Sequence, residues 1–80
     1  IDIIAKKDNI IIFVEVKYRT NSKSGLGESA VNKNKQIHII NSAKNYMAEI
    51  YKTDELPCRF DVIAINGNLL HHIENAFDGC

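Results

Sequence analysis

Three ionisable residues in two apolar stretches have the types and spacing to do chemistry: Asp2, Glu15 and Lys17. Glu15 and Lys17 are two residues apart in an apolar run, and residues two apart on a β-strand point to the same face of the sheet. Charged groups on a strand built for burial cost free energy unless they are paired, protonated or bound to a metal ion. One interpretation is therefore a reactive carboxylate and amine held on a rigid strand.

The chain around these residues predicts a β-hairpin. Residues 1–5, apart from Asp2, and residues 10–14 are apolar, and residues 6–9 between them are polar. Two apolar runs separated by a short polar segment are typical of two antiparallel strands joined by a tight turn. The two carboxylates would then lie on adjacent strands.

The position of the turn decides how the two acids face each other. A two-residue loop at Asp8 and Asn9, both tolerant of positive φ, places Asp2 directly across from Glu15. A loop shifted by one residue places Asp2 opposite Phe13 and diagonal to Glu15, still on the same face and within reach of one ion. Either register predicts that the two acids are neighbours.

Two neighbouring carboxylates repel each other, and one lysine does not neutralise both. Hard divalent cations prefer oxygen ligands, so Mg²⁺ or Mn²⁺ is the expected partner of Asp2 and Glu15. The alternative interpretation needs no metal: Asp2 is a solvated residue at a strand edge, and Glu15 forms a cross-strand ion pair with Lys17. The hairpin pattern alone leaves both interpretations open.

The charge of the chain is balanced overall but not locally. Ten basic residues match ten acidic ones, yet five basic residues and one acid, Glu28, lie between positions 17 and 35. This local excess predicts a phosphate-attracting patch beside the carboxylates, with a solvated surface as the alternative. The candidates for binding nucleic acid are Arg19, Lys23, Lys35 and Gln36.

The length of 80 residues and the 45% hydrophobic content predict one small domain over residues 1–80. No apolar stretch is long enough to span a bilayer, and no leader is recognisable. Cys58 and Cys80 have neither disulfide-framework nor zinc-ligand spacing, so we expect neither a disulfide nor structural zinc, and a cytoplasmic protein. The first residue is Ile1, within a predicted strand, which suggests a fragment of a longer chain.

The rest of the sequence predicts one helix and two further strands. Apolar residues recur at helical spacing over residues 32–51, and strand patterns occupy residues 59–65 and 69–74, with a turn at 66–67. The helix positions expected to face the core are Ile37, Ile40, Ala43, Met47 and Ile50. A loop is expected over residues 20–29. The order strand, strand, helix, strand, strand predicts an α/β fold with a mixed sheet.

Five blocks of the sequence resemble a known family. They are Ile1–Ala5, Phe13–Lys17, Ala30-Val31 followed by Lys35, Arg59–Val62 and Asn75–Phe77. Together they resemble the YraN-like family of uncharacterised bacterial proteins, which is related in fold to archaeal Holliday-junction resolvases. More broadly, an Asp on one strand and Glu-x-Lys on the next resemble the PD-(D/E)XK nuclease superfamily.

The resemblance implies a restriction-endonuclease-like sheet whose usual N-terminal helix is absent from this sequence. It implies Mg²⁺- or Mn²⁺-dependent hydrolysis of phosphodiester bonds in DNA, including branched or junction DNA. Asp2, Glu15 and the Val16 carbonyl would hold the ion, and Lys17 would assist the attacking water. Two cuts in one junction would require a homodimer. The rival functions are a catalytically inactive nucleic-acid-binding or assembly module and an RNA-directed nuclease.

Overall fold

The computed structural model describes residues 1–19 and 31–80, so the loop expected at residues 20–29 lies outside the described residues. The secondary-structure elements are β1 (Ile3–Lys7), β2 (Ile10–Arg19), α1 (Lys33–Tyr51), β3 (Cys58–Asn66) and β4 (Leu69–Phe77). This order confirms the predicted sequence of strand, strand, helix, strand, strand.

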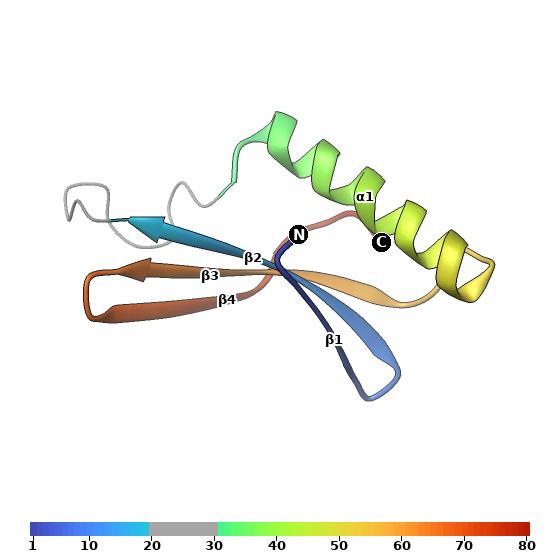
Figure 1. The fold of residues 1–80 in the computed structure, drawn as a ribbon, viewed down its shortest axis with the longest axis horizontal. Helices are drawn as coiled ribbons and strands as arrows, with labels where there is room; N and C mark the ends of the chain where they lie inside the picture. Colours follow the sequence, from blue (N-terminus) through green and yellow to red (C-terminus); the bar gives the residue numbers. More distant parts are fainter. Residues whose placement is uncertain (20–30) are drawn as a thin grey trace.

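The strands form a four-stranded sheet in the order β1-β2-β3-β4. β2 and β3 run parallel, whereas β1 and β4 are antiparallel to their neighbours, so the sheet is mixed as expected. The helix α1 connects the two parallel strands and lies along one face of the sheet (Figure 1). A parallel pair needs a crossover connection of this kind, because its second strand starts at the end where its first strand began.

The β1–β2 hairpin has the first of the two predicted registers. Asp8 and Asn9 both have positive φ, 53° and 66°, and Lys7 pairs with Ile10. Positive φ at both central residues is the geometry of a tight turn that matches the twist of the strands, and Asn and Asp adopt it at low cost. The alternative register with the loop one residue earlier is wrong.

Packing between α1 and the two central strands forms the core. Phe13 and Phe60 stack with ring centroids 5.6 Å apart, Phe60 stacks on Phe77 at 5.0 Å, and Tyr46 meets the edge of Phe13. On the opposite face of β2, Ile12 and Val14 are also buried, flanked by β1 and β3. The central strand is therefore rigid, which suits it to position functional side chains.

The helix begins as predicted, and its buried face matches the predicted stripe at Ala43 and Met47 but not at its two ends. Asn32 caps it by accepting a hydrogen bond from the Lys35 N–H at 2.9 Å. The buried helix residues are Ile39, Ala43 and Met47, spaced four apart. Ile37 and Ile50, expected to face the core, are instead 49% and 56% exposed. Both stripes fit helical periodicity, and docking on the sheet chooses between them.

The β3–β4 hairpin differs from expectation in two ways. Asn66 pairs with Leu69, so the turn occupies residues 67–68 rather than 66–67. β4 also continues to Phe77, past the predicted end at residue 74, because a register shift opposite Phe60 and Val62 lets pairing resume. Asn75 has a positive φ of 53° at this irregularity, a conformation that Asn tolerates better than most residues.

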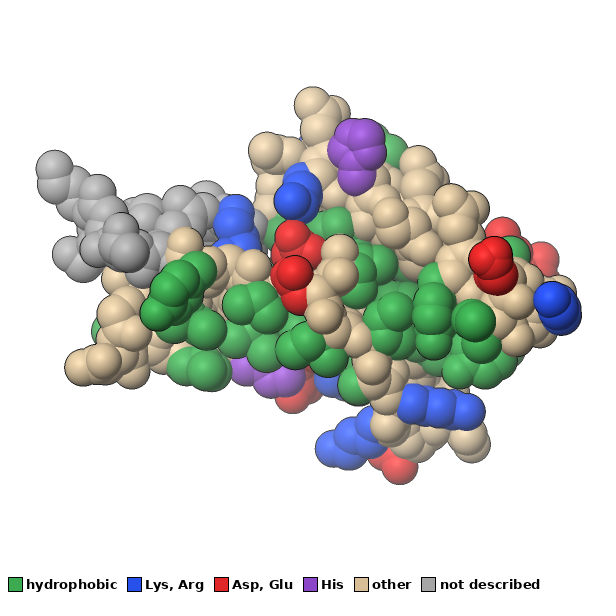
Figure 2. Space-filling model, in the orientation of Figure 1, with side chains coloured by type: hydrophobic (Ala, Val, Ile, Leu, Met, Phe, Trp, Pro, Cys, Tyr) green, Lys and Arg blue, Asp and Glu red, His purple; other side chains and the backbone are tan. Residues whose placement is uncertain are grey.

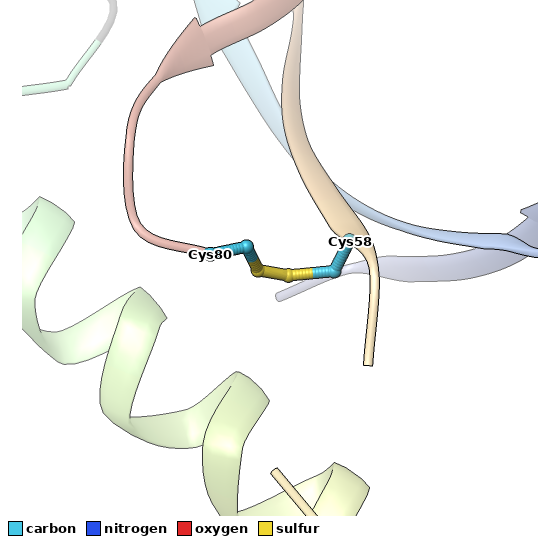
Figure 3. Close-up of a disulfide and its surroundings, with 2 residues drawn as sticks. All are labelled: Cys58 and Cys80. Atoms are coloured by element: carbon cyan, nitrogen blue, oxygen red, sulfur yellow. A yellow bond between two sulfur atoms is a disulfide. The ribbon is translucent and has the colours of Figure 1, made fainter. Parts of the chain in front are cut away.

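The expectation that the two cysteines are unpaired is wrong. Cys80, near the end of the segment after β4, forms a disulfide with Cys58, the first residue of β3 (Figure 3). The Cα atoms are 5.7 Å apart, and 22 residues separate the two positions. Sequence spacing did not indicate the disulfide, because the disulfide depends on the path of the chain after β4. This segment returns beside α1, where Gly79 packs against Ile40 and Phe60.

Within residues 1–19 and 31–80, no helix combines the length and the apolar character that crossing a bilayer requires.

Candidate active site at the β1–β2 hairpin

Asp2 lies next to the middle of β2, as the hairpin register predicts. Ile3 pairs with Val14, so Asp2 is one step further along, level with Glu15. The Asp2 N–H donates to the Val14 carbonyl at 2.9 Å, and its Oδ2 accepts from the Val16 N–H at 2.8 Å. One carboxylate oxygen thus fastens the start of the chain to β2. Val16, expected to contribute its carbonyl, contacts Asp2 through its N–H.

Glu15 lies on the face of β2 that α1 covers, and its side chain is only 13% exposed. Its Oε2 is 3.4 Å from the Lys35 ammonium, and its Oε1 is 3.3 Å from the α-ammonium of Ile1. The contact with Ile1 lies outside hydrogen-bond geometry, and Oε1 is buried without a hydrogen-bond partner. A buried carboxylate oxygen without a hydrogen bond is unusual, and the charge of Glu15 is offset by the two ammonium groups instead.

Lys17 is two residues beyond Glu15 on β2, level with Ala64 of β3. Both side chains line a cavity of about 220 Å³ between the end of β2 and the start of α1. Its lining residues are Glu15, Val16, Lys17, Val31, Asn32 and Lys35. The predicted Glu-x-Lys pair thus borders a small polar hollow rather than a closed core.

Lys35 and Gln36, the two nucleic-acid-binding candidates at the start of α1, make different contacts. Lys35, predicted to bind nucleic acid, pairs with Glu15 instead of standing apart in solvent. Gln36 donates from Nε2 to the Val31 carbonyl at 3.1 Å, which stabilises the chain just before the helix. The remaining candidates, the Arg19 side chain and Lys23, lie outside the described residues.

The donor set fits a divalent cation in its chemistry. Glu15 Oε1 has no hydrogen-bond donor, Asp2 keeps a second carboxylate oxygen, and both groups are hard oxygen ligands of the kind that Mg²⁺ and Mn²⁺ prefer. Among the described residues, no three side chains of His, Cys, Asp and Glu gather as a metal-binding group. A cation here would be held by two carboxylates together with backbone oxygen and water, as Mg²⁺ often is.

A second polar cluster surrounds Asp61 on β3. The buried Asp61 carboxylate accepts from Arg59 Nε at 2.8 Å, from Arg59 Nη2 at 2.9 Å and from the Asn75 N–H at 3.0 Å, and lies 2.8 Å from His72 Nε2. His72 reaches Asp61 because of the β3–β4 register, in which His72 pairs with Ile63. His71 and His72 lie on opposite faces, as expected from their adjacency.

Burial would raise the pKa of Asp61, but hydrogen bonds from Arg59, Asn75 and His72 outweigh it and lower that pKa below its usual value. The same contact with Asp61 raises the pKa of Arg59. Hydrogen bonds to the charged form favour ionisation. Because Arg59, Asn75 and His72 come from β3 and β4, this network ties the edge strand to the centre of the sheet.

Charged side chains of both signs gather beside apolar ones on one face of the molecule. Figure 2 shows acidic and basic side chains in contact near the middle of this face, next to a band of apolar side chains. Within the candidate site, Glu15 and Lys35 form an ion pair between opposite charges.

The sequence is similar to a family model and to many curated proteins. The model of the uncharacterised protein family UPF0102 matches residues 1–65. A UPF0102 protein of Lachnoclostridium phytofermentans is 44% identical over 78 residues, which is 98% of this chain and 66% of that protein.

Two further relatives carry the same description. A UPF0102 protein of Thermodesulfovibrio yellowstonii is 49% identical and one of Saccharophagus degradans 38% identical, each over 96% of this chain and covering 67% and 65% of the relative. The chain therefore spans about two thirds of the length of the curated relatives it matches. These matches confirm the resemblance to the YraN-like family: the chain belongs to the uncharacterised protein family UPF0102.

Proposed function

We propose that this chain carries the active site of a Mg²⁺- or Mn²⁺-dependent endonuclease that hydrolyses phosphodiester bonds in DNA, with branched or junction DNA as the substrate class. One observation supports this proposal above the others. Glu15 Oε1 is buried and makes no hydrogen bond, and Asp2 is level with Glu15 on the neighbouring strand. A buried carboxylate oxygen that makes no hydrogen bond is available as a ligand for a cation.

Asp2, Glu15 and the carbonyl of Val16 would hold the ion. When bound, a divalent cation supplies positive charge to the phosphoryl oxygens and activates the attacking water. The residues of this chain supply the positioning. β2 is held rigidly in the sheet, and Asp2 is fixed by its hydrogen bond to the Val16 N–H. A preorganised site costs little reorganisation when charge develops in the transition state.

Lys17 borders the same cavity as Glu15. Its Nζ would donate a hydrogen bond to a phosphoryl oxygen or to the attacking water and stabilise the negative charge that develops there. Arg19, Lys23, Lys35 and Gln36 are the proposed contacts to the DNA backbone, in line with the basic charge of residues 17–35. Resolution of a symmetric junction would use two copies of this site, one for each cut.

The test is cleavage of branched, flapped and linear duplex DNA, and of an RNA duplex, with Mg²⁺ or Mn²⁺. We expect Glu15→Gln to reduce the rate at least about 100-fold, because it removes a charged ligand while keeping the shape of the side chain. Glu49→Gln, on the exposed part of α1, is the matched control and should cleave like the wild type. Equal rates for wild type and Glu15→Gln would contradict the assignment, and preference for RNA would redirect it.

One observation favours a second candidate, a nucleic-acid-binding module without turnover. The ion pair between Glu15 and Lys35 partly neutralises the carboxylate without any metal. A binding module needs no cation site, so calorimetric titration with Mn²⁺ separates the two functions. Heat that disappears in Asp2→Ala supports the nuclease, whereas an absence of heat in the wild type supports the binding module.

A further inference from the structure

We infer that Lys35 is a resident counter-ion of Glu15, which a divalent cation displaces and which then binds a phosphate group of the nucleic acid. This inference rests on the proposed function and assigns Lys35 a positioning role in it. The starting observation is the 3.4 Å separation of Lys35 Nζ from Glu15 Oε2.

The location of Lys35 in the helix is unfavourable by itself. It lies in the first turn of α1, which contains no acidic residue. The helix dipole puts partial positive charge at this end, so an ammonium group here is repelled. Glu15 compensates for this repulsion, and Lys35 in turn compensates a carboxylate that is only 13% exposed. Each group therefore offsets a cost of the other while the cation is absent.

Lys35 is built to leave the carboxylate without disturbing the fold. Its side chain is 56% exposed, so its movement opens no core. Its backbone is held independently, because the Lys35 N–H donates to the Asn32 side chain at 2.9 Å. A lysine carries its charge on a flexible stem with several rotatable bonds. The ammonium can therefore move while the start of the helix stays in place.

A divalent cation and the Lys35 ammonium compete for the same group. A cation on Glu15 would lie a few ångströms from the ammonium, and like charges at that distance repel strongly. Lys35 also lines the 220 Å³ cavity together with Lys17. A displaced ammonium therefore remains at the rim of this cavity, where a phosphate oxygen is a suitable new partner.

The test measures Mn²⁺ affinity by titration calorimetry, with Mn²⁺ alone and no nucleic acid. For this titration the protein is produced with an N-terminal tag. The Ile1 nitrogen is then a peptide N–H rather than the ammonium found 3.3 Å from Glu15. Removal of a competing cation strengthens metal binding, so we expect Lys35→Gln to bind Mn²⁺ about fivefold more tightly than the wild type.

Two variants control for side effects. Lys33→Gln removes a charge from the same helical turn, at a position for which the described structure gives no ion pair, and should change the affinity less than about twofold. Lys35→Arg keeps the charge and should resemble the wild type. Binding of duplex DNA in Ca²⁺ should weaken in Lys35→Gln, with the salt slope reduced by about one.

The outcomes separate this inference from the proposed function. If the wild type binds no Mn²⁺, the proposed metal site is wrong and the inference falls with it. If the wild type binds Mn²⁺ and Lys35→Gln binds it equally or more weakly, the counter-ion role is wrong while the metal site stands. Tighter binding in both Lys33→Gln and Lys35→Gln would reveal a general charge effect and would also overturn the role of Lys35.

Discussion

His72 and Asp61 lie on different strands, yet His72 Nε2 is 2.8 Å from Asp61 Oδ2. The carboxylate of Asp61 is buried and also binds Arg59 and the Asn75 N–H. Four contacts on one carboxylate use both of its oxygens. The network anchors β4 where its pairing with β3 shifts register, so it stabilises the sheet at a point where the ladder is interrupted.

Replacement of Asp61 by Asn should destabilise the protein by about 2 kcal/mol at pH 7, because hydrogen bonds to a charged group are lost and Arg59 loses its counter-ion. Urea denaturation followed by circular dichroism measures the change. Glu74→Gln is the matched control, since Glu74 is exposed and 4.0 Å from Arg59, and should cost less than about 0.5 kcal/mol. Equal losses in both variants would contradict a special role for Asp61.

The stabilisation from Asp61 should depend on pH in a defined direction. The pKa of Asp61 is lower in the folded protein than its ordinary value, so the folded state favours the ionised form. This contribution is complete above the unfolded pKa, about 3.9, and is lost as the pH falls through the lower folded pKa. The difference in melting temperature between wild type and Asp61→Asn should therefore shrink as the pH falls below about 4.

Two substitutions of Asp2 should separate its structural role from its proposed metal role. Asp2→Asn keeps an oxygen that accepts from the Val16 N–H, so the free energy of unfolding should change by less than about 1 kcal/mol. Mn²⁺ affinity should nevertheless fall at least about tenfold, because a charged ligand is lost. Asp2→Ala should lose both the affinity and the hydrogen bond. Unchanged affinity in Asp2→Asn would exclude Asp2 from the metal site.

Any side chain at Gly79 should disturb the packing of the chain after β4. A Cβ atom there would lie 2.6 Å from Ile40 Cγ1 and 2.8 Å from Phe60 Cε2, closer than van der Waals contact allows. We expect Gly79→Ala to destabilise the protein by about 1–3 kcal/mol, as overpacked sites do. Thermal denaturation measures the loss. A Gly79→Ala variant as stable as the wild type would show that the segment can shift away from α1.

The sequence by itself determined the elements whose causes are local. The β1–β2 hairpin follows from two apolar runs joined by a short polar segment, and both registers that the pattern allows place Asp2 on the same face as Glu15; the structure has the turn at Asp8 and Asn9. The start of α1 follows from the capping side chain of Asn32. These features depend on a few neighbouring residues, so the chain pattern is sufficient to predict them.

Tertiary structure alone decided the contacts between distant elements. Ile37 is exposed because the rotation of α1 on the sheet turns Ile39, Ala43 and Met47 toward the core instead. Lys35 meets Glu15, and Cys80 meets Cys58, because of where the helix and the chain after β4 come to lie. Such contacts depend on the rotation of a helix, the position of a bulge and the path of the chain, which arise from the packing of the whole domain.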